Sequence, residues 1–223
     1  MRRVVLVLAL VAATLVTTSG MALAVNEIGT NAPDTLKGTN RADNLMGRGG
    51  NDVLFGLGGR DNLLGEDGKD WILGGNEQRP LGGDKNLVGG AGNDAVLGGT
   101  GPDKQFGGSG NDLVNGGPGP DKISGESGTD LLLDGEIRGG ATDVLIGGDG
   151  NDVLDPFNRP AKKDIVACGS GFDRVIADTE DLVASDCERV AVGASAANKL
   201  DQQLAEEGFY DRLFGGLAPP PSR

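Results

Sequence analysis

The stretch that decides the fold reads Gly89-Gly90-Ala91-Gly92-Asn93-Asp94-Ala95-Val96-Leu97, and its pattern recurs at Gly107-Gly108-Ser109-Gly110-Asn111-Asp112-Leu113-Val114-Asn115. Each copy has the form G-G-x-G-x-D-x-U-x, in which U is an apolar residue. Twelve repeats keep the aspartate of this pattern in register: Asp34, Asp43, Asp52, Asp61, Asp70, Asp94, Asp103, Asp112, Asp121, Asp130, Asp143 and Asp152. A period of nine residues fits neither an α-helix nor a simple strand, so we expect a repeat solenoid.

Eleven of the twelve repeats place an apolar residue two positions after the aspartate: Leu36, Leu45, Leu54, Leu63, Ile72, Val96, Val114, Ile123, Leu132, Leu145 and Leu154. The exception is Gln105, which has Phe106 beside it. Each repeat supplies a glycine-rich turn and a strand of about three residues, which is too short to be stable alone. Two repeats make a coil of 18 residues, and parallel stacking of such coils about 4.8 Å apart aligns the apolar residues inside. The sequence therefore predicts an all-β parallel solenoid in which repeats n and n+2 are neighbours.

The repeat carries the ligands that calcium prefers, which are about six to eight oxygens from carboxylates and backbone carbonyls. Glycines let the turn backbone bring carbonyls together, and each aspartate adds a short carboxylate. Turns rich in glycine and aspartate also occur simply because they are well solvated. Here, however, stacking sets like charges close together, which opposes folding unless a cation neutralises them. We therefore expect the chain to fold on binding several calcium ions, with the twelve aspartates as ligands.

These repeats resemble the haemolysin-type, RTX-like calcium-binding repeats over residues 29–155. The resemblance implies a β-roll in which each ion lies between the turns of two adjacent coils, held by an aspartate and carbonyls from each. Ala32, Arg41 and Ala141 replace the fourth-position glycine of the pattern, so the turns from Gly89 to Asp130 match it best. Carried onto this sequence, the resemblance implies these pairs: Asp34 with Asp52, Asp43 with Asp61, Asp52 with Asp70, Asp94 with Asp112, Asp103 with Asp121, and Asp112 with Asp130.

The period is interrupted within and after the repeats. Between Asp70 and Asp94, Glu77-Gln78-Arg79-Pro80 replaces the turn segment, and we expect a bulge or a lost ion there. After the β-roll, Asp164 and Asp173 recur nine residues apart, and we interpret them as part of degenerate closing coils.

The region 156–192 is therefore expected to hold degenerate coils and a cap that covers the end of the stack. Cys168 and Cys187 are the only two cysteines, and we predict a disulfide between them, with two free buried thiols as the alternative. Residues 193–223 are predicted to form a short helix, from Ala194 to Glu207, and a Pro-rich tail. The helix packs on the cap or serves as a handle for a partner.

The N-terminus has the pattern of a cleaved secretory signal over residues 1–24. Two arginines precede a 13-residue apolar run, Val4 to Val16, and Ala22-Leu23-Ala24 ends the pattern. The alternative is a membrane anchor, but this run is too short for a helix that crosses about 30 Å of hydrocarbon. Cleavage would remove two of the 20 basic and none of the 33 acidic residues, which changes the net charge from −13 to −15. Such a chain repels nucleic acid and anionic membranes, and divalent cations suit it as partners.

The sequence argues against most enzyme classes, because it contains no histidine. HExxH zinc sites and Ser-His-Asp or Cys-His arrangements are thereby excluded. We predict a secreted, non-enzymatic calcium-binding protein with a structural or adhesive extracellular role and an unidentified protein or surface ligand. The alternative is an extracellular, polysaccharide-modifying enzyme that uses carboxylates alone. A pore-forming toxin is disfavoured, because no apolar insertion segment follows residue 24.

Overall fold

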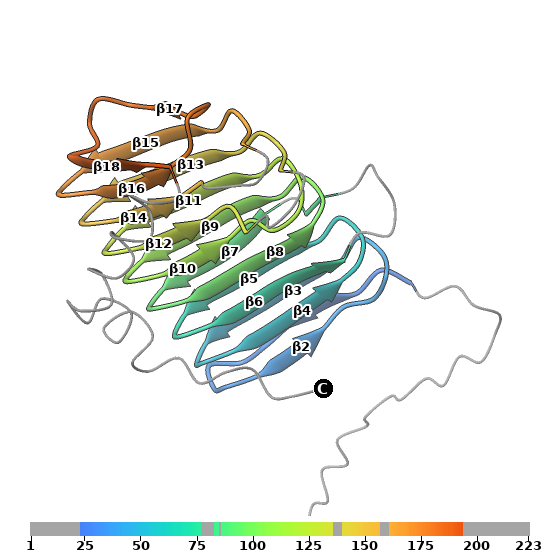
Figure 1. Cartoon of the computed structure of the whole chain (residues 1–223). Helices are drawn as coiled ribbons and strands as arrows, with labels where there is room; N and C mark the ends of the chain where they lie inside the picture. The colour runs from blue at the N-terminus through green and yellow to red at the C-terminus, as the bar shows by residue number, and fades with distance from the viewer. Residues whose placement is uncertain (1–22, 77–82, 85, 136–139, 157–160, 194–223) are drawn as a thin grey trace, which may run out of the picture.

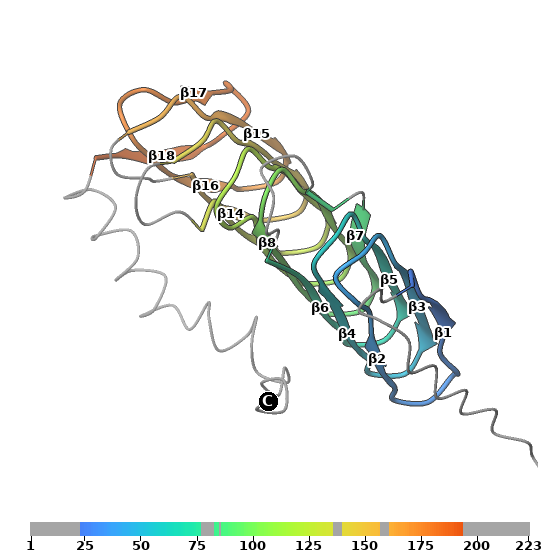
Figure 2. The ribbon, with the colours of Figure 1, turned by 90° about the vertical axis from the view of Figure 1, so that its right-hand side faces the viewer.

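The computed structural model describes residues 23–76, 83–84, 86–135, 140–156 and 161–193. In this part of the chain, two parallel sheets of nine strands face each other along one solenoid (Figures 1 and 2). The odd sheet contains β1 (Asn26–Ile28), β3 (Asn44–Gly49), β5 (Asn62–Asp67), β7 (Asn86–Ala91), β9 (Lys104–Ser109), β11 (Lys122–Ser127), β13 (Val144–Asp149), β15 (Ile165–Ser170) and β17 (Leu182–Val183). The even sheet contains β2 (Thr35–Lys37), β4 (Val53–Leu57), β6 (Trp71–Asn76), β8 (Ala95–Thr100), β10 (Leu113–Asn115), β12 (Leu131–Leu133), β14 (Val153–Asp155), β16 (Arg174–Ala177) and β18 (Arg189–Val192).

Each strand pairs in parallel with the strand one coil further along the chain. Leu45 of β3 lies opposite Leu63 of β5, and Val96 of β8 lies opposite Val114 of β10, so the register step is 18 residues. The prediction of a parallel solenoid with repeats n and n+2 as neighbours is therefore confirmed.

The core is a double row of side chains, one from each repeat. All eleven apolar residues that the repeat pattern places inward are buried, and Leu87, Val166 and Val175 continue the rows. Gln105 occupies the inward position of its repeat and is also fully buried. Its amide Nε2 donates to the carbonyl oxygen of Asn115 at 3.0 Å, whereas Phe106 faces outward and lies under Lys104. Because each repeat buries a single side chain in these rows, stability depends on stacking.

The insertions leave the pairing of the strands intact. Leu63 lies opposite Leu87, 24 residues later, and Leu132 lies opposite Leu154, 22 residues later. The expected bulge or lost ion between Asp70 and Asp94 stays a prediction, and β5 and β7 pair in register on either side of this segment. Extra residues lengthen a connection without shifting the inward positions, because a slip would expose the apolar row.

The last coil is closed by β17 and β18, and a disulfide joins Cys168 to Cys187, as predicted. The predicted helix over residues 194–207, the Pro-rich tail and residues 1–22 of the predicted signal lie outside the described residues. The described residues contain no helix. Accordingly, no membrane-spanning helix was found among them.

Candidate metal sites

The aspartates of the repeats form two columns, one along each edge of the solenoid. Turns that lead from an odd to an even strand carry the first ladder: Asp34, Asp52, Asp70, Asp94, Asp112, Asp130, Asp152 and Asp173. Turns that lead from an even to an odd strand carry the second ladder: Asp43, Asp61, Asp84, Asp103, Asp121, Asp143 and Asp164. Fourteen of these fifteen side chains are buried, and Asp34, in the first coil, is half-buried.

In every ladder aspartate after Asp34, one carboxylate oxygen accepts a hydrogen bond from the backbone of the preceding coil. The N–H of Asp94 donates to Oδ1 of Asp112 at 2.8 Å, and the N–H of Asp112 donates to Oδ1 of Asp130 at 2.9 Å. In the second ladder, the N–H of Asp103 donates to Oδ1 of Asp121 at 2.7 Å. These bonds fix the rotamer of each aspartate and therefore the direction of its second oxygen, Oδ2.

The second oxygens of the first ladder have no such donor. Oδ2 is buried and accepts no hydrogen bond from the described residues in Asp52, Asp70, Asp94, Asp112, Asp130 and Asp152. Each of these atoms lies against the α-carbon of the first glycine in its own repeat, where a carbonyl of the next coil also arrives. A Cβ on Gly107, for example, would lie 2.5 Å from Oδ2 of Asp112 and 2.8 Å from the carbonyl oxygen of Gly125. Oxygens of two coils thus converge at a point where only glycine fits.

Burial makes these carboxylates resist ionisation. Desolvation is the main cause that raises the pKa of Asp94 to about 7, of Asp112 to about 8 and of Asp121 to about 9. The hydrogen bond from the preceding coil lowers each pKa, whereas neighbouring carboxylates raise it further. Ionised ladders therefore need a cation to offset both the desolvation and the mutual repulsion.

The donor set identifies the class of cation. Carboxylate and carbonyl oxygens are hard ligands, and neither a histidine nor a free cysteine contributes to the described ladders. Such a set suits calcium, which accepts irregular geometry, better than it suits zinc or copper. The buried Oδ2 atoms and the glycine positions fit this ion. In the first ladder, the candidate ligand atoms are Oδ2 of the aspartates and the carbonyl oxygens that meet it.

All six aspartate pairs that the resemblance implies are neighbours in these ladders, each joined by the N–H to Oδ1 bond. Their role as calcium ligands stays a prediction. The two N-terminal repeats differ from the rest, because a threonine fills the second position of the pattern. Oδ2 of Asp34 accepts the backbone N–H of Thr30 at 2.6 Å and its hydroxyl at 2.9 Å, and Thr39 does the same for Asp43. In Asp34, a donor thus already occupies the oxygen that accepts no hydrogen bond from the described residues in the inner aspartates of the first ladder.

Three aspartates of the ladders were not among the predicted ligands. Asp84 takes the place that the interrupted repeat was expected to leave empty: the N–H of Asp61 donates to Asp84, and the N–H of Asp84 donates to Asp103. The sequence Gly82-Gly83-Asp84 resembles the end of a repeat turn. However, Leu87 stands three residues after Asp84 instead of two, so the repeat pattern does not identify it as the inward residue. Asp164 and Asp173 also continue the ladders, so the closing coils carry them to the end of the stack.

The sequence reasoning also missed Asp134, which stands where the first glycine of a repeat is expected. Asp134, Asp143 and Asp164 are all buried, and one carboxylate oxygen from each lies within 4.8 Å of the other two. The second ladder thus gathers a third carboxylate near its C-terminal end. A gap in the glycine pattern that is filled by an acidic residue was the signal for this cluster.

Comparison with known families agrees with this geometry. The family model described as the RTX calcium-binding nonapeptide repeat (4 copies) matches residues 28–63, 46–77, 82–104, 106–133 and 137–155. These matches cover more than half of the chain and contain all twelve of the predicted aspartates. No curated protein matches the chain.

Proposed function

Since this chain belongs to the family of RTX calcium-binding nonapeptide repeat proteins, we propose that calcium ions bound along its two ladders hold the coils together. The protein is then a secreted, non-enzymatic repeat protein that folds on binding calcium and serves a structural or adhesive role outside the cell. The observation that carries this proposal is the row of buried Oδ2 atoms in the first ladder. Each meets a carbonyl of the next coil and accepts no hydrogen bond from the part of the chain that the structure describes.

Calcium binding and folding are coupled in this proposal. The ladder oxygens come together only when the coils stack, and the stacked coils without a cation hold buried carboxylates that repel one another. The free energy of binding is therefore largely free energy of folding. Calcium modules outside the cell commonly bind with dissociation constants of about 10⁻⁴ to 10⁻³ M, so this chain would stay unfolded at cytosolic calcium levels.

Two further features support an extracellular role. The disulfide between Cys168 and Cys187 is of the kind that persists in oxidising compartments. The N-terminal pattern of residues 1–24 fits a cleaved secretory signal.

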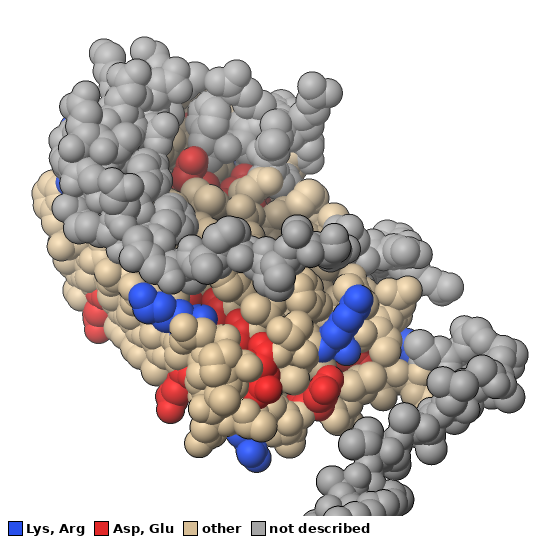
Figure 3. Space-filling view, turned by 90° about the horizontal axis from the view of Figure 1, so that it is seen from below, with Lys and Arg blue, Asp and Glu red and all other residues tan. Residues whose placement is uncertain are grey.

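On the face drawn in Figure 3, basic and acidic side chains lie interspersed, so the uncovered part of that face offers no single-sign patch for nucleic acid or membranes.

A calcium titration followed by far-UV circular dichroism tests the proposal. The purified protein is expected to gain β signal cooperatively with calcium and not with magnesium, which demands a tighter octahedral site. Full β signal in excess chelator would contradict calcium-dependent folding.

A matched pair of variants then tests the ladder itself. Asp112→Asn removes the charge of a carboxylate whose Oδ2 has no donor among the described residues, whereas Asp34→Asn changes a carboxylate that Thr30 already satisfies. We expect Asp112→Asn to shift the calcium midpoint upward by about tenfold and Asp34→Asn to shift it much less. Equal shifts in the two variants would mean that the donor-free oxygens are not the ligands.

A further inference from the structure

The first ladder continues beyond the last nonapeptide match and ends on a residue outside that pattern. The N–H of Asp152 donates to Oδ1 of Asp173 at 2.8 Å, and the N–H of Asp173 donates to Oε2 of Glu188, also at 2.8 Å. Arg174 and Arg189, which directly follow Asp173 and Glu188, are register partners in β16 and β18. Glu188 therefore occupies the place of an aspartate one coil beyond Asp173, with a longer side chain.

Like the aspartates of the inner coils in the first ladder, Asp173 has an Oδ2 without a hydrogen-bond donor among the described residues. Its side chain is 0% exposed, and its Oδ2 accepts no hydrogen bond from the described residues. Burial raises the pKa of Asp173, the N–H of Asp152 lowers it, and the acidic groups of Glu188 and Asp186 raise it further. The charged groups that raise the pKa of Asp173 are thus both negative, and a cation would neutralise them.

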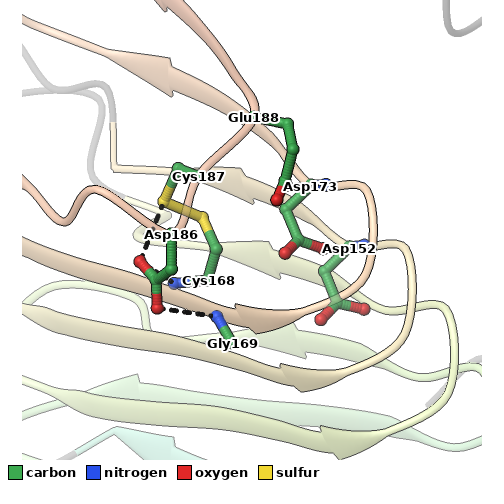
Figure 4. The surroundings of a disulfide bond; sticks show 7 residues. All are labelled: Asp152, Cys168, Gly169, Asp173, Asp186, Cys187 and Glu188. Atoms are coloured by element: carbon green, nitrogen blue, oxygen red, sulfur yellow. Dashed lines mark hydrogen bonds between the residues drawn. A yellow bond between two sulfur atoms is a disulfide. The ribbon is translucent and has the colours of Figure 1, made fainter.

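Asp186 and Glu188 of the cap accept hydrogen bonds from different backbone groups of the coil before it (Figure 4). Oδ1 of Asp186 accepts the N–H of Cys168 at 3.4 Å, and its Oδ2 accepts the N–H of Gly169 at 3.1 Å. These backbone groups lie in β15 beyond the residues that pair with β17, so Asp186 takes the part that carbonyls of a longer neighbouring strand would play. Glu188 extends the carboxylate ladder instead.

The disulfide joins these groups to the coil below. Cys187 lies between Asp186 and Glu188 in sequence, and it is bonded to Cys168, which occupies the first-glycine position of the Asp173 repeat. The carbonyl oxygen of Cys168 meets Oδ2 of Asp152 at the α-carbon of Gly147, as the equivalent glycine carbonyls do in the inner coils. Glu188 is an exposed side chain, and the disulfide limits the positions that its backbone can reach.

We propose that Asp173 and Glu188 bind one further calcium ion at the C-terminal end of the first ladder, and that the disulfide holds Glu188 in place for it. This inference rests on the proposed function, because it extends calcium binding from the nonapeptide turns to the cap. Asp173 contributes a buried carboxylate and Glu188 an exposed one. Calcium accepts such a mixture, with water completing the set of ligands.

Equilibrium dialysis with radioactive calcium tests this site by counting the ions bound per chain. Glu188→Gln keeps an oxygen that can accept the N–H of Asp173 but removes the charge, so the cap is expected to stay folded in calcium, as circular dichroism will show. We expect this variant, and likewise Asp173→Asn, to bind one ion fewer than the wild type. Glu180→Gln is the control, because it removes one charge from an exposed residue of the same cap and is expected to bind the wild-type number.

The outcomes separate this inference from the proposed function. If Glu188→Gln binds as many ions as the wild type, with the same affinities, the terminal site is wrong while calcium binding by the repeats stands. If the wild type binds no calcium, the proposed function itself fails.

A second set of variants tests the disulfide. Replacing Cys168 and Cys187 with serine is expected to weaken the binding of the terminal ion by about tenfold, as loss of an outer support commonly does. Adding Glu188→Gln to this variant then removes the same single ion that it removes from the wild type. An unchanged affinity for the terminal ion in the double serine variant would overturn the role of the disulfide.

Discussion

The backbone N–H of Asp94 donates a 2.8 Å hydrogen bond to Oδ1 of Asp112, one coil further along the solenoid. This bond pins the carboxylate of Asp112 and leaves its Oδ2 buried and without a donor in the described residues. One contact thus stacks two coils and also creates an oxygen that needs a cation. The proposed calcium binding would therefore be linked to folding in every coil where this relationship repeats.

Without calcium, the chain is expected to gain structure as the pH falls. The pKa values of Asp94 and Asp112 are raised from 3.8 to about 7 and about 8 in the folded state. Between these limits the folded chain binds more protons than the unfolded chain, so the free energy of unfolding rises as the pH falls. The destabilisation is largest above about pH 8, where both carboxylates would be ionised. Circular dichroism in chelator at about pH 5 and about pH 8 measures the effect.

With calcium the pH dependence of binding has the opposite direction. Protons and calcium compete for the same carboxylates, so the calcium midpoint is expected to move to higher concentrations at about pH 5. A midpoint that does not change with pH would show that the ladder carboxylates are not the ligands. Equal β signal in chelator at both pH values would contradict the raised pKa values as a cause of instability.

Two glycines of the same strand are expected to respond differently to alanine. A Cβ on Gly47 would meet the carboxylate of Asp52 and lie 2.9 Å from the carbonyl oxygen of Gly65. A Cβ on Gly49 would lie 3.7 Å from its nearest neighbours, which is ordinary van der Waals contact. We expect Gly47→Ala to abolish calcium binding at this rung and to lower the melting temperature in calcium, whereas Gly49→Ala is tolerated. Equal melting temperatures for the two variants would contradict the convergence of oxygens at Gly47.

Replacing Gln105 with leucine is expected to stabilise the calcium-bound protein. The side chain of Gln105 is 0% exposed in an otherwise apolar row, and its Oε1 is buried without a hydrogen-bond partner among the described residues. An unsatisfied buried acceptor costs about 1–3 kcal/mol, although the variant also gives up the bond from Nε2 to Asn115. Thermal unfolding in saturating calcium measures the difference. A lower melting temperature for Gln105→Leu would mean that the bond to Asn115 outweighs the unsatisfied oxygen.

The regular part of the fold could be predicted from the sequence, because the glycines and the aspartate of each repeat indicate its turn and the spacing from the aspartate indicates its inward residue. Leu54 and Leu63 lie in the rows that their spacing from Asp52 and Asp61 requires. The period of nine therefore predicts the register of the sheets without knowledge of any contact. Asp84 was missed because one extra residue separates it from Leu87, although stacking tolerates the insertion.

The ends of the ladders could not be read from the period, since their partners lie outside the pattern. Thr30 satisfies Asp34 through a local turn, and Glu188 meets Asp173 across 15 residues. Neither partner has the spacing of the repeat. At each end of the described solenoid, the structure describes no further coil, and a nearby side chain forms the hydrogen bond that a further coil would form.

The backbone is strained at Glu126, which has a φ of 76°. Its register partners in the neighbouring strands, Gly108 and Gly148, also have positive φ, but they have no side chain. Glycine adopts this conformation without the strain of about 1–2 kcal/mol that a side chain brings. Against this gain, glycine costs about 0.5–1 kcal/mol because it loses more conformational entropy on folding. Glu126→Gly is therefore expected to raise the free energy of unfolding in saturating calcium by about 0.5–1 kcal/mol. Glu126→Gln reports the effect of charge alone, and Ser127→Gly, in the same strand but without a positive φ, is expected to lower stability. If denaturant unfolding shows that Glu126→Gly is no more stable than Glu126→Gln, the strain at this position does not limit stability.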